Sequence, residues 1–410
     1  MRLRTILRLA VADYERIREA GLARRLSRAA AAGPRAGHVL IAGPGNGSIG
    51  DEAMYEAFVR AADDAVTVIA REPADLLWRS ESADVRYVYL RDLVYGRPSR
   101  HSKDLRTFID LVGRARSLSV IGADIMDGVY DELASARRFR LAALAASAGA
   151  DARILGFSWN SHPTNRALNA MRAVGDRVLL LARDEASGRR LQENGGHRVQ
   201  TVADLAFLTT PDAPLADARL DAWLASERGA GRRIVVVNAN PRQEKLFPGL
   251  RTQYIALIEQ LRADGFSCII LPHDSRGGAR SEESYLARIA ADVGSEHVYL
   301  VEKAPLPDQV VAISREGEIV VSGRMHLVVL ASVAGRATVA LEYQDKFAGL
   351  YRLLGYDGRV VRSESGEWDL VAAVRKGLES ARRSELRLAD SWPTVLERSR
   401  RNLPRISASE

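Results

Sequence analysis

The chain has 410 residues, of which 47% are hydrophobic and 27% are charged, and its formal net charge is +7. This length and apolar content predict a globular protein of two domains rather than one. No stretch approaches the run of about 18 apolar residues that a membrane-spanning helix needs. Arginines also interrupt the N-terminal segment where a secretory signal needs an apolar region, so we expect neither a membrane span nor export.

The single cysteine, Cys268, lies in the apolar run FSCIILP and has no partner for an intrachain disulfide. We interpret it as a core residue rather than a nucleophile. The absence of a cysteine pair fits a reducing compartment, so we expect the protein to be cytoplasmic.

The positive charge gathers at the two ends of the chain. Residues 1–28 carry eight arginines against three acidic residues, and residues 375–405 carry nine basic against four acidic residues. The middle is therefore slightly acidic, which argues against nucleic acid as a partner. Two interpretations stay open for the ends: peripheral contact with the inner face of the cytoplasmic membrane, or solvated helices of an arginine-rich protein. We predict a basic helix over 1–36 and a helical extension over 366–410.

From His38 onward, short β-rich runs alternate with helical stretches, which predicts parallel sheets covered by helices on both faces. The first series of runs is 38–43, 66–70, 85–90, 118–122, 152–158, 177–182 and 197–202. After a Pro- and Ala-rich lapse near 210–232, the second series is 233–239, 266–272, 297–301, 318–323, 337–342 and 358–361.

These two series predict an α/β protein with two Rossmann-like, doubly wound domains. We place the N-terminal domain at 37–215 and the C-terminal domain at 230–365. Ligands of such sheets bind at the carboxyl ends of strands, and the cleft between two such domains is the expected site.

The loop PGNGSIGDE satisfies G-x-G-x-x-G through Gly45, Gly47 and Gly50, between a strand and a helix. A pyrophosphate needs bare N–H groups at the positive end of the helix, yet Asp51 and Glu52 stand there. We therefore favour another role over dinucleotide binding. Asp51 either stabilises the helix dipole or is presented to sugar hydroxyls and proton transfer, and the two roles are compatible.

Carboxylates follow the fourth predicted strand. Asp124 and Asp127 come after the run 118–122, where they can accept hydrogen bonds from hydroxyls or act as acid and base. The alternative is that Asp127 or Asp131 caps the following helix. No His or Cys lies at ligand spacing around them, so we expect no metal site.

Cations follow three later strands. Arg183 ends the run 177–182, where it either binds an anion or pairs with a local carboxylate. Arg324 and His326 open an apolar helix after another strand, so a cation, an imidazole and helix N–H groups converge there. Lys346 follows the next strand and belongs to the same rim. This combination suits an anionic substrate.

Taken together, these motifs resemble the polysaccharide pyruvyltransferase family. SGRMHLVVLASVAG, followed by ATVALEYQDKFAGL, is similar to the family's R-x-H helix start and its downstream Y-D-x-K segment. The family's succession of R-D-x-x-S, glycine and D-x-A-F is similar to the stretch ARDEASGRRLQENGGHRVQTVADLAF. The family's N-x-G-D-E-A loop is similar to SIGDEAM. The resemblance covers roughly residues 38–355. It departs from the family at Ser48, where the family has asparagine, and in EYQDK, which replaces a tyrosine-aspartate-proline run.

The resemblance implies two Rossmann-like domains of glycosyltransferase-B type, with the acceptor on the domain 37–215 and the donor on the domain 230–365. It implies phosphoenolpyruvate as the donor and a saccharide as the acceptor, free or lipid-linked, without a metal or a bound cofactor. One sugar hydroxyl would add to the phosphate-bearing carbon of phosphoenolpyruvate while the methylene carbon takes up a proton. Phosphate would then leave, and a second hydroxyl of the same sugar would close a cyclic pyruvate ketal.

The site residues follow from the resemblance and from strand ends. The resemblance carries donor and catalytic roles to Arg324, His326, Lys346 and Arg183, and adds Arg242. We assign His326 as the acid/base, because an imidazole exchanges protons near neutral pH, and Asp51 as a second catalytic candidate. His273, in LPHDSRGG, is predicted to contact the donor. The predicted acceptor-binding residues are Asn46, Ser48, Glu52, Asp124 and Asp127.

Two other functions stay open from the sequence. One is a glycosyltransferase that uses a nucleotide sugar on the same two-domain fold. The other is a non-catalytic protein that binds glycans or membranes through its basic ends. The joint presence of Arg324, His326 and Lys346 argues against the second, because a scaffold has no need of them.

Overall fold

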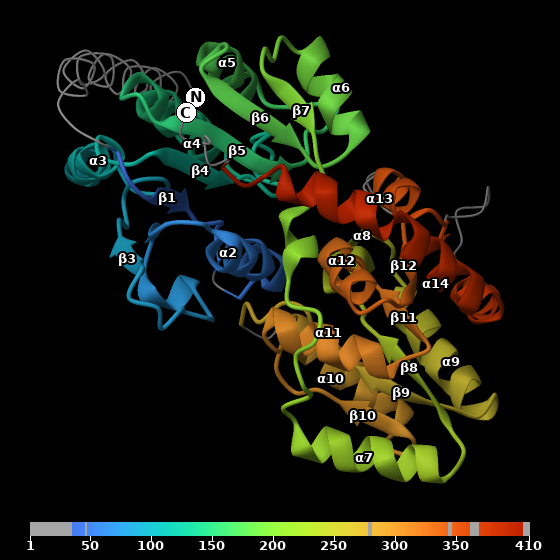
Figure 1. The fold of residues 1–410 in the computed structure, drawn as a ribbon. Helices are drawn as coiled ribbons and strands as arrows, with labels where there is room; N and C mark the ends of the chain where they lie inside the picture. The colour runs from blue at the N-terminus through green and yellow to red at the C-terminus, as the bar shows by residue number, and fades with distance from the viewer. Residues whose placement is uncertain (1–34, 46, 278–280, 343–346, 361–368, 405–410) are drawn as a thin grey trace, which may run out of the picture. The chain divides into compact units, whose positions relative to one another are not determined.

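The computed structural model describes residues 35–45, 47–277, 281–342, 347–360 and 369–404 (Figure 1). Within these ranges the chain forms two compact units: residues 35–44, 58–203 and 401–404 make the first, and residues 45–57 and 204–400 make the second. The loop and helix start at 45–57 therefore group with the second unit, although we expected them in the domain 37–215. Asn46, Lys346 and nearly all of the predicted helix 1–36 lie outside the described residues.

The first unit is built on a parallel sheet with the strand order β3-β2-β1-β4-β5-β6-β7. Every residue of β1 and β4 is buried, as expected for central strands that helices cover on both faces. Along the edge strand β3 the side chains are only partly buried or exposed. The strands are β1 (His38–Ile41), β2 (Val66–Ala70), β3 (Val85–Tyr89), β4 (Ser117–Ile121), β5 (Asp151–Phe157), β6 (Val178–Ala182) and β7 (Val199–Thr201).

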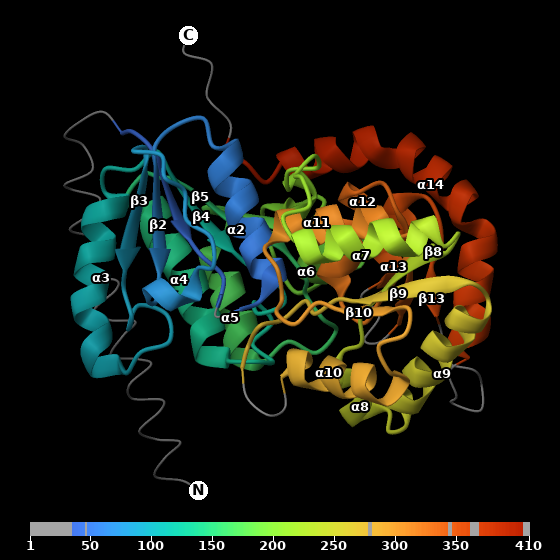
Figure 2. The same cartoon turned by 90° about the horizontal axis from the view of Figure 1, so that it is seen from below.

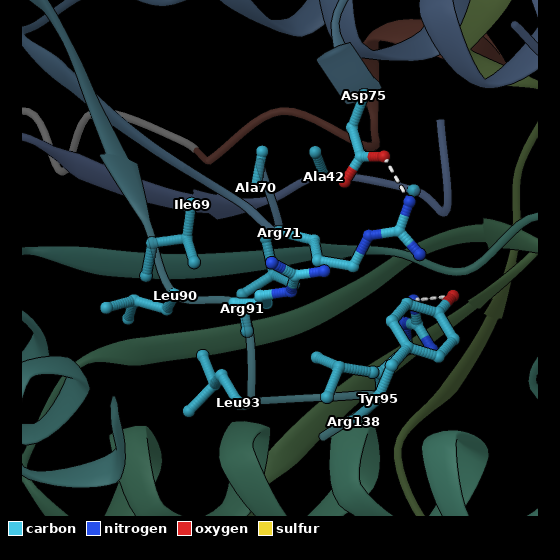
Figure 3. Close-up of a pocket in the computed structure, with 13 residues that line it drawn as sticks. Ala42, Ile69, Ala70, Arg71, Asp75, Leu90, Arg91, Leu93, Tyr95 and Arg138 are labelled. Atoms are coloured by element: carbon cyan, nitrogen blue, oxygen red, sulfur yellow. Dashed lines mark hydrogen bonds and ion pairs between the residues drawn. The ribbon is translucent and has the colours of Figure 1, made fainter. Parts of the chain in front are cut away.

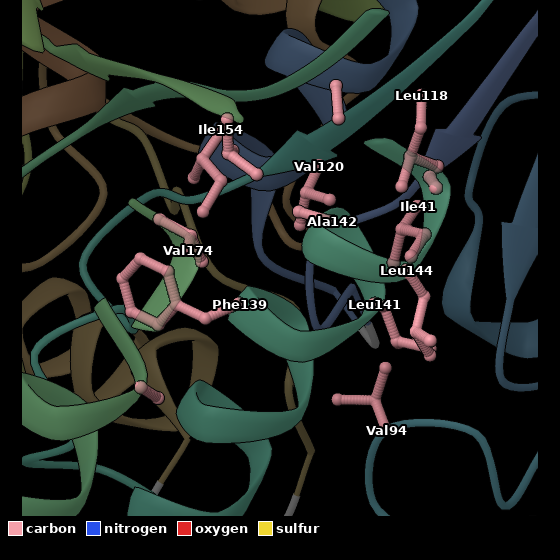
Figure 4. Close-up of a cluster of buried hydrophobic side chains, with 14 of the residues drawn as sticks. Ile41, Val94, Leu118, Val120, Phe139, Leu141, Ala142, Leu144, Ile154 and Val174 are labelled. Carbon is pink, nitrogen blue, oxygen red and sulfur yellow. The ribbon is translucent and has the colours of Figure 1, made fainter. Parts of the chain in front are cut away.

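Helices α3, α4 and α5 enclose the main core of the first unit against one face of this sheet. Figure 4 shows Phe139, Leu141 and Leu144 of α4 packed among strand residues such as Val120 and Ile154. The helical segments are α2 (Ile49–Ala61), a short 3-10 turn η1 (Pro73–Asp75), α3 (Pro98–Val112), α4 (Glu132–Ser147), α5 (Asn165–Val174) and α6 (Glu185–Glu193). Helix α2 crosses the boundary between the units, since its residues up to Ala57 group with the second.

The second unit is also a parallel sheet, with the order β10-β9-β8-β11-β12-β13. Figure 2 shows α9 and α10 on one side of it and α11 and α12 on the other. Its strands are β8 (Arg233–Val237), β9 (Phe266–Ile270), β10 (Val298–Leu300), β11 (Ile319–Ser322), β12 (Ala337–Leu341) and β13 (Arg359–Val360). Its helical segments are η2 (Leu205–Leu208), α7 (Ala218–Gly229), α8 (Pro241–Leu246), α9 (Leu250–Ala263), α10 (Glu282–Val293), α11 (Pro307–Glu316), α12 (Met325–Val333), α13 (Phe347–Leu354) and α14 (Leu370–Arg400).

The strand predictions are confirmed: each of the thirteen predicted β-rich runs overlaps one of the strands β1 to β13, and the ends differ by a residue at β4 and β5. Cys268 lies in β9 and is fully buried, and burial raises the pKa of its thiol to about 12. It is therefore a core residue, as we interpreted it. Across the described ranges, no helix combines the length and the apolar character that crossing a membrane requires.

Candidate active site

The predicted residues that the structure brings together lie in the second unit, at the carboxyl edge of its sheet. Strand β8 lies between β9 and β11, and the chain order reverses across β8 and β11. The loops after β8, β9 and β11 therefore meet where doubly wound sheets bind ligands.

Arg324 is fixed by two carboxylates. After β11 ends, the Ser322 hydroxyl accepts a hydrogen bond from the Arg324 N–H at 3.0 Å and donates one to the Arg324 carbonyl at 2.6 Å. The guanidinium Nε donates to Glu282 Oε2 at 2.7 Å, and its Nη2 lies 3.1 Å from Asp274 Oδ2. We expected Arg324 as a cation for the donor, and the structure presents it with a fixed orientation and a partly neutralised charge.

Glu282 ties three loops of the site together. It is wholly buried at the start of α10, and its second oxygen accepts hydrogen bonds from Asn238 Nδ2 at 2.8 Å and from the His273 N–H at 2.6 Å. The buried carboxylate thus meets two neutral donors as well as the Arg324 guanidinium, which offsets the cost of removing its charge from water. The arrangement sets the position of the loops after β8 and β9 relative to Arg324.

His326 lies between a buried carboxylate and helix α2. Its Nε2 is 3.3 Å from Oδ2 of Asp204, within ion-pair distance, although the angle does not make a hydrogen bond. On the other side, a Cβ placed on Gly50 would come within 2.2 Å of His326 Nδ1. Only a residue without a side chain allows the ring to lie there. His326 keeps 16% of its side chain exposed, so it is neither a packed core residue nor a freely moving one.

His273 is a second imidazole at the same edge. It is only 4% exposed, and neither ring nitrogen has a hydrogen-bond partner among the described residues. Burial lowers the pKa of His273 well below its usual 6.5, and the charges of His326 and Arg324 act in the same direction, while Asp274 opposes them. His273 is therefore neutral at neutral pH.

The glycine-rich loop docks on the segment that follows β9. The Ser275 N–H donates to the Gly47 carbonyl at 2.8 Å, and Ser48 forms an isolated antiparallel bridge with Asp274. Gly47 has φ +94°, a left-handed conformation that favours glycine, and a Cβ there would meet Ser275 Oγ at 2.2 Å. The loop is therefore held by backbone contacts that side chains at these glycines would prevent.

Asp274 and Arg276 form an ion pair beside this loop. Burial alone would raise the pKa of Asp274, but hydrogen bonds from Arg276 and the charge of Arg324 hold it below its ordinary value. Hydrogen bonding to Asp274 raises the pKa of Arg276, and the nearby Asp51 carboxylate adds to this shift. The charge of Asp51 therefore acts on Arg276, and its role at the site stays a prediction.

Other predicted residues of the second unit lie around this cluster. Ser48 is partly buried and Glu52 is only 2% exposed. Arg242 lies exposed on the short helix α8, and its backbone N–H is capped by Asn240 Oδ1 at 3.0 Å.

The predicted residues of the first unit make local contacts there. Arg183 is buried and pairs with Asp124, and its Nε donates to Ser158 Oγ at 2.8 Å, as in the alternative in which Arg183 has a local carboxylate partner. Asp127 Oδ2 accepts a hydrogen bond from Asn160 Nδ2 at 2.6 Å. Asp131 is the N-cap of α4, accepting from two backbone N–H groups at 2.9 Å. Of the two capping alternatives, Asp131 is the correct one.

Sequence reasoning assigned no role to several residues of the cluster, namely Asp204, Asn238, Asp274, Arg276 and Glu282. Asp204 begins the D-x-A-F motif, which can be seen in the sequence. The sequence does not show that Asp204 pairs with His326, 122 positions later. Glu282 gave no signal, because it stands at an ordinary helix start. Across the described ranges, no group of three or more His, Cys, Asp or Glu side chains is arranged to hold a metal ion.

Comparison with protein-family models gives a match to the polysaccharide pyruvyl transferase model over residues 49–345. This range includes the glycine-rich loop from Ile49, Asp204, the loop after β9 and the Arg324–His326 helix start. A sequence search of curated proteins finds no match.

Comparison with solved structures gives matches that cover most of this chain at low sequence identity. HepE from Anabaena, in complex with UDP and glucose, is 12% identical with a TM-score of 0.54, over 89% of this chain and 95% of that one. UDP-GlcNAc 2-epimerase from Methanocaldococcus jannaschii is 11% identical with a TM-score of 0.54, over 84% and 91%. The trehalose-6-phosphate synthase OtsA is 13% identical with a TM-score of 0.56, over 89% and 96%. At such identities the likeness concerns the fold alone, and it confirms two Rossmann-like domains of glycosyltransferase-B type.

Proposed function

Because the chain belongs to the polysaccharide pyruvyl transferase family, we propose that it moves the pyruvyl group of phosphoenolpyruvate onto two hydroxyls of one sugar residue, forming a cyclic ketal and releasing phosphate. The observation that carries the proposal is the placement of His326 against Asp204 and Gly50, two residues from the fixed guanidinium of Arg324. All four residues lie within the matched range.

His326 is the proposed acid/base. Asp204 faces Nε2 from a buried position, so it orients the ring and stabilises the imidazolium that forms when Nδ1 takes up a proton. Nδ1 is then the nitrogen that exchanges protons with the substrates. In the first step one hydroxyl adds to the phosphate-bearing carbon and gives up its proton, and the methylene carbon takes up one proton, so no net proton is gained or lost. In the second step phosphate leaves, and the second hydroxyl closes the ketal and gives up its proton to the base.

The donor is proposed to lie against Arg324 and His273. A guanidinium offers five N–H donors in a planar fork, so its contacts with Glu282 and Asp274 are compatible with binding a carboxylate or phosphate as well. The neutral His273 can donate one hydrogen bond to the donor without adding charge. Lys346, Arg242 and Arg183 remain proposed donor contacts. On the acceptor side, Asp51 and Ser48 are proposed to bind sugar hydroxyls.

Turnover tests the proposal directly. The purified protein is incubated with phosphoenolpyruvate and a panel of hexose and hexosamine acceptors, including lipid-linked ones, while phosphate release and the mass gain of one carboxyethylidene group are followed. We expect both signals together. His326→Asn should lower kcat by about 100- to 10,000-fold, the usual contribution of a positioned acid or base. His162→Asn, at an exposed histidine of the first unit, is the matched control and should keep wild-type kcat.

Two outcomes would overturn the proposal. One is a His326→Asn variant that turns over like the wild type. The other is thermal stabilisation by UDP but not by phosphoenolpyruvate, with no ketal product from any acceptor. That second result would favour a glycosyltransferase that uses a nucleotide sugar.

A further inference from the structure

The first unit contains a pocket that the chemistry above does not use. It lies at the carboxyl ends of β1, β2 and β3 and encloses about 20 Å³ (Figure 3). Ile41, Ile69 and Leu90, at or next to the strand ends, give it an apolar base, and three arginines line it: Arg71, Arg91 and Arg138. The chain order of this sheet reverses between β1 and β4, so the pocket adjoins the position where such sheets bind ligands.

Arg138 is a buried cation that pairs with no carboxylate among the residues that the structure describes. It comes from α4 and is 1% exposed. Its Nη2 donates to the Tyr95 hydroxyl at 2.8 Å, and its guanidinium carbon lies 5.0 Å from the centre of the Tyr95 ring. Its Nε and Nη1 are buried and have no hydrogen-bond partner, and no carboxylate of the described residues pairs with it. Since a buried charge is costly unless it is paired, this guanidinium is arranged for an anion that comes from outside the chain.

The other arginines leave the pocket positive. Arg71 Nη2 donates to the buried Asp75 at 2.7 Å, while the Nε of Arg71 is buried without a hydrogen-bond partner. Arg91 is exposed and lines the pocket from the residue after Leu90. Arg71 Nη2 also lies 3.4 Å from Glu72 Oε1, so three guanidiniums stand against two carboxylates. The remaining positive charge suits an anionic phosphoryl oxygen, which the planar arginine fork can bind.

We propose that this pocket, defined by Arg71, Arg91 and Arg138, binds a phosphoryl group. The pocket has room for a group about the size of a water molecule. One oxygen of the phosphoryl group can therefore enter it, while the rest of the phosphate ester stays at its mouth. The group fits a sugar phosphate or the phosphate of a lipid-linked sugar, and its assignment to the acceptor rests on the proposed function. The anion site itself does not rest on it.

Hydrogen–deuterium exchange of the full-length protein tests the site without any turnover. We expect inorganic pyrophosphate to protect backbone amides in peptides that cover residues 71–76 and 90–96. Arg138→Met should abolish this protection or raise the apparent Kd about tenfold or more. Arg91→Met, at an exposed residue that leaves the buried arginine in place, should weaken binding as well and covers the case in which Arg138→Met does not fold. Arg106→Met removes the same charge from an exposed position on α3 and should bind like the wild type.

A second arm separates the two sources of phosphate. Phosphatidylglycerol vesicles, compared with phosphatidylcholine vesicles, replace pyrophosphate in the same measurement. Protection by pyrophosphate supports a soluble phosphate ester, and protection by the anionic vesicles alone supports a lipid headgroup. The proposal fails if neither probe protects these peptides, or if Arg106→Met weakens protection as much as Arg91→Met does. Because the readout is amide exchange, failure of pyruvyl transfer would leave this result unchanged.

Discussion

At the scale of single residues, Gly50 links the glycine-rich loop to the proposed acid/base. The dinucleotide interpretation of Gly45, Gly47 and Gly50 treats these glycines as room for a pyrophosphate. The structure gives Gly50 a different partner, because the His326 ring occupies the space that its side chain would fill. Its conformational freedom matters less than its missing Cβ.

Gly50→Ala should therefore impair catalysis more than stability. The added methyl would push the imidazole away, and a displacement of about 1 Å at a reacting group costs about 100-fold in rate. The loss should appear in kcat, measured with saturating phosphoenolpyruvate. The free energy of unfolding should change little, because alanine favours the helix by about 1 kcal/mol over glycine and this gain offsets the crowding by the added methyl. Gly229→Ala, at a glycine of α7 with no atom within 4 Å of the added Cβ, is the control and should keep full activity. An unchanged kcat in Gly50→Ala would mean that Gly50 does not position the ring.

His273 should make stability depend on pH. Its pKa in the folded protein lies well below 6.5, mainly because of burial, so below pH 6.5 the unfolded chain binds a proton that the folded protein does not. Unfolding is therefore favoured as the pH falls from 6.5 toward the lowered pKa, by up to about 1.4 kcal/mol per pH unit. Asp274 acts in a different window, since its lowered pKa contributes stability that is lost only as the pH falls below 3.8.

Chemical denaturation between about pH 7.5 and about pH 5 measures this slope. His273→Gln should flatten it relative to the wild type, whereas His162→Gln, at an exposed histidine, should not. An identical slope in His273→Gln would show that this imidazole is not kept neutral by the fold.

At the scale of elements, helix starts explain which carboxylates are structural. Asp131 and Asp184 cap α4 and α6, and Asn240 caps α8, each through side-chain oxygens that accept backbone N–H groups. Arg324 stands at the same position before α12 and makes no such bond, so its side chain turns to Glu282 and Asp274 instead. The start of α12 therefore differs from the starts of α4, α6 and α8, because its N-cap side chain binds two carboxylates instead of backbone N–H groups.

Asp131→Ala should lower the free energy of unfolding by about 1 kcal/mol, the usual cost of losing an N-cap, and leave kcat unchanged. Asp131→Ser should restore most of the loss, because serine also caps helices well. Urea denaturation of the three proteins measures the difference. If Asp131→Ala lowered kcat and kept the stability, the residue would belong to the site and not to the helix.

At the scale of the whole molecule, the two units present different kinds of polar sites at the carboxyl edges of their sheets. The second unit gathers imidazoles, carboxylates and paired arginines. The first gathers arginines around a small cavity. The segment 45–57, which follows β1 of the first unit in the chain, groups with the second unit.

The sequence by itself determined the elements and the family. Local periodicity sets the strands and helices, which is why every predicted strand is present. The family is indicated by the short motifs R-x-H, D-x-A-F and G-D-E, which can be seen in the sequence. Only the tertiary structure decided which motifs meet. Asp204 lies beside His326, and Gly50 leaves space for the His326 ring. Glu282 fixes the guanidinium of Arg324. Each contact joins residues that are far apart in the chain. The same holds for Arg183, which follows β6 and pairs with Asp124 after β4, 59 positions earlier in the chain and on the far side of β5 in the sheet. Periodicity shows which residues of one helix or strand are buried. The order of the strands in the sheet decides which loops come together and which of their residues can pair.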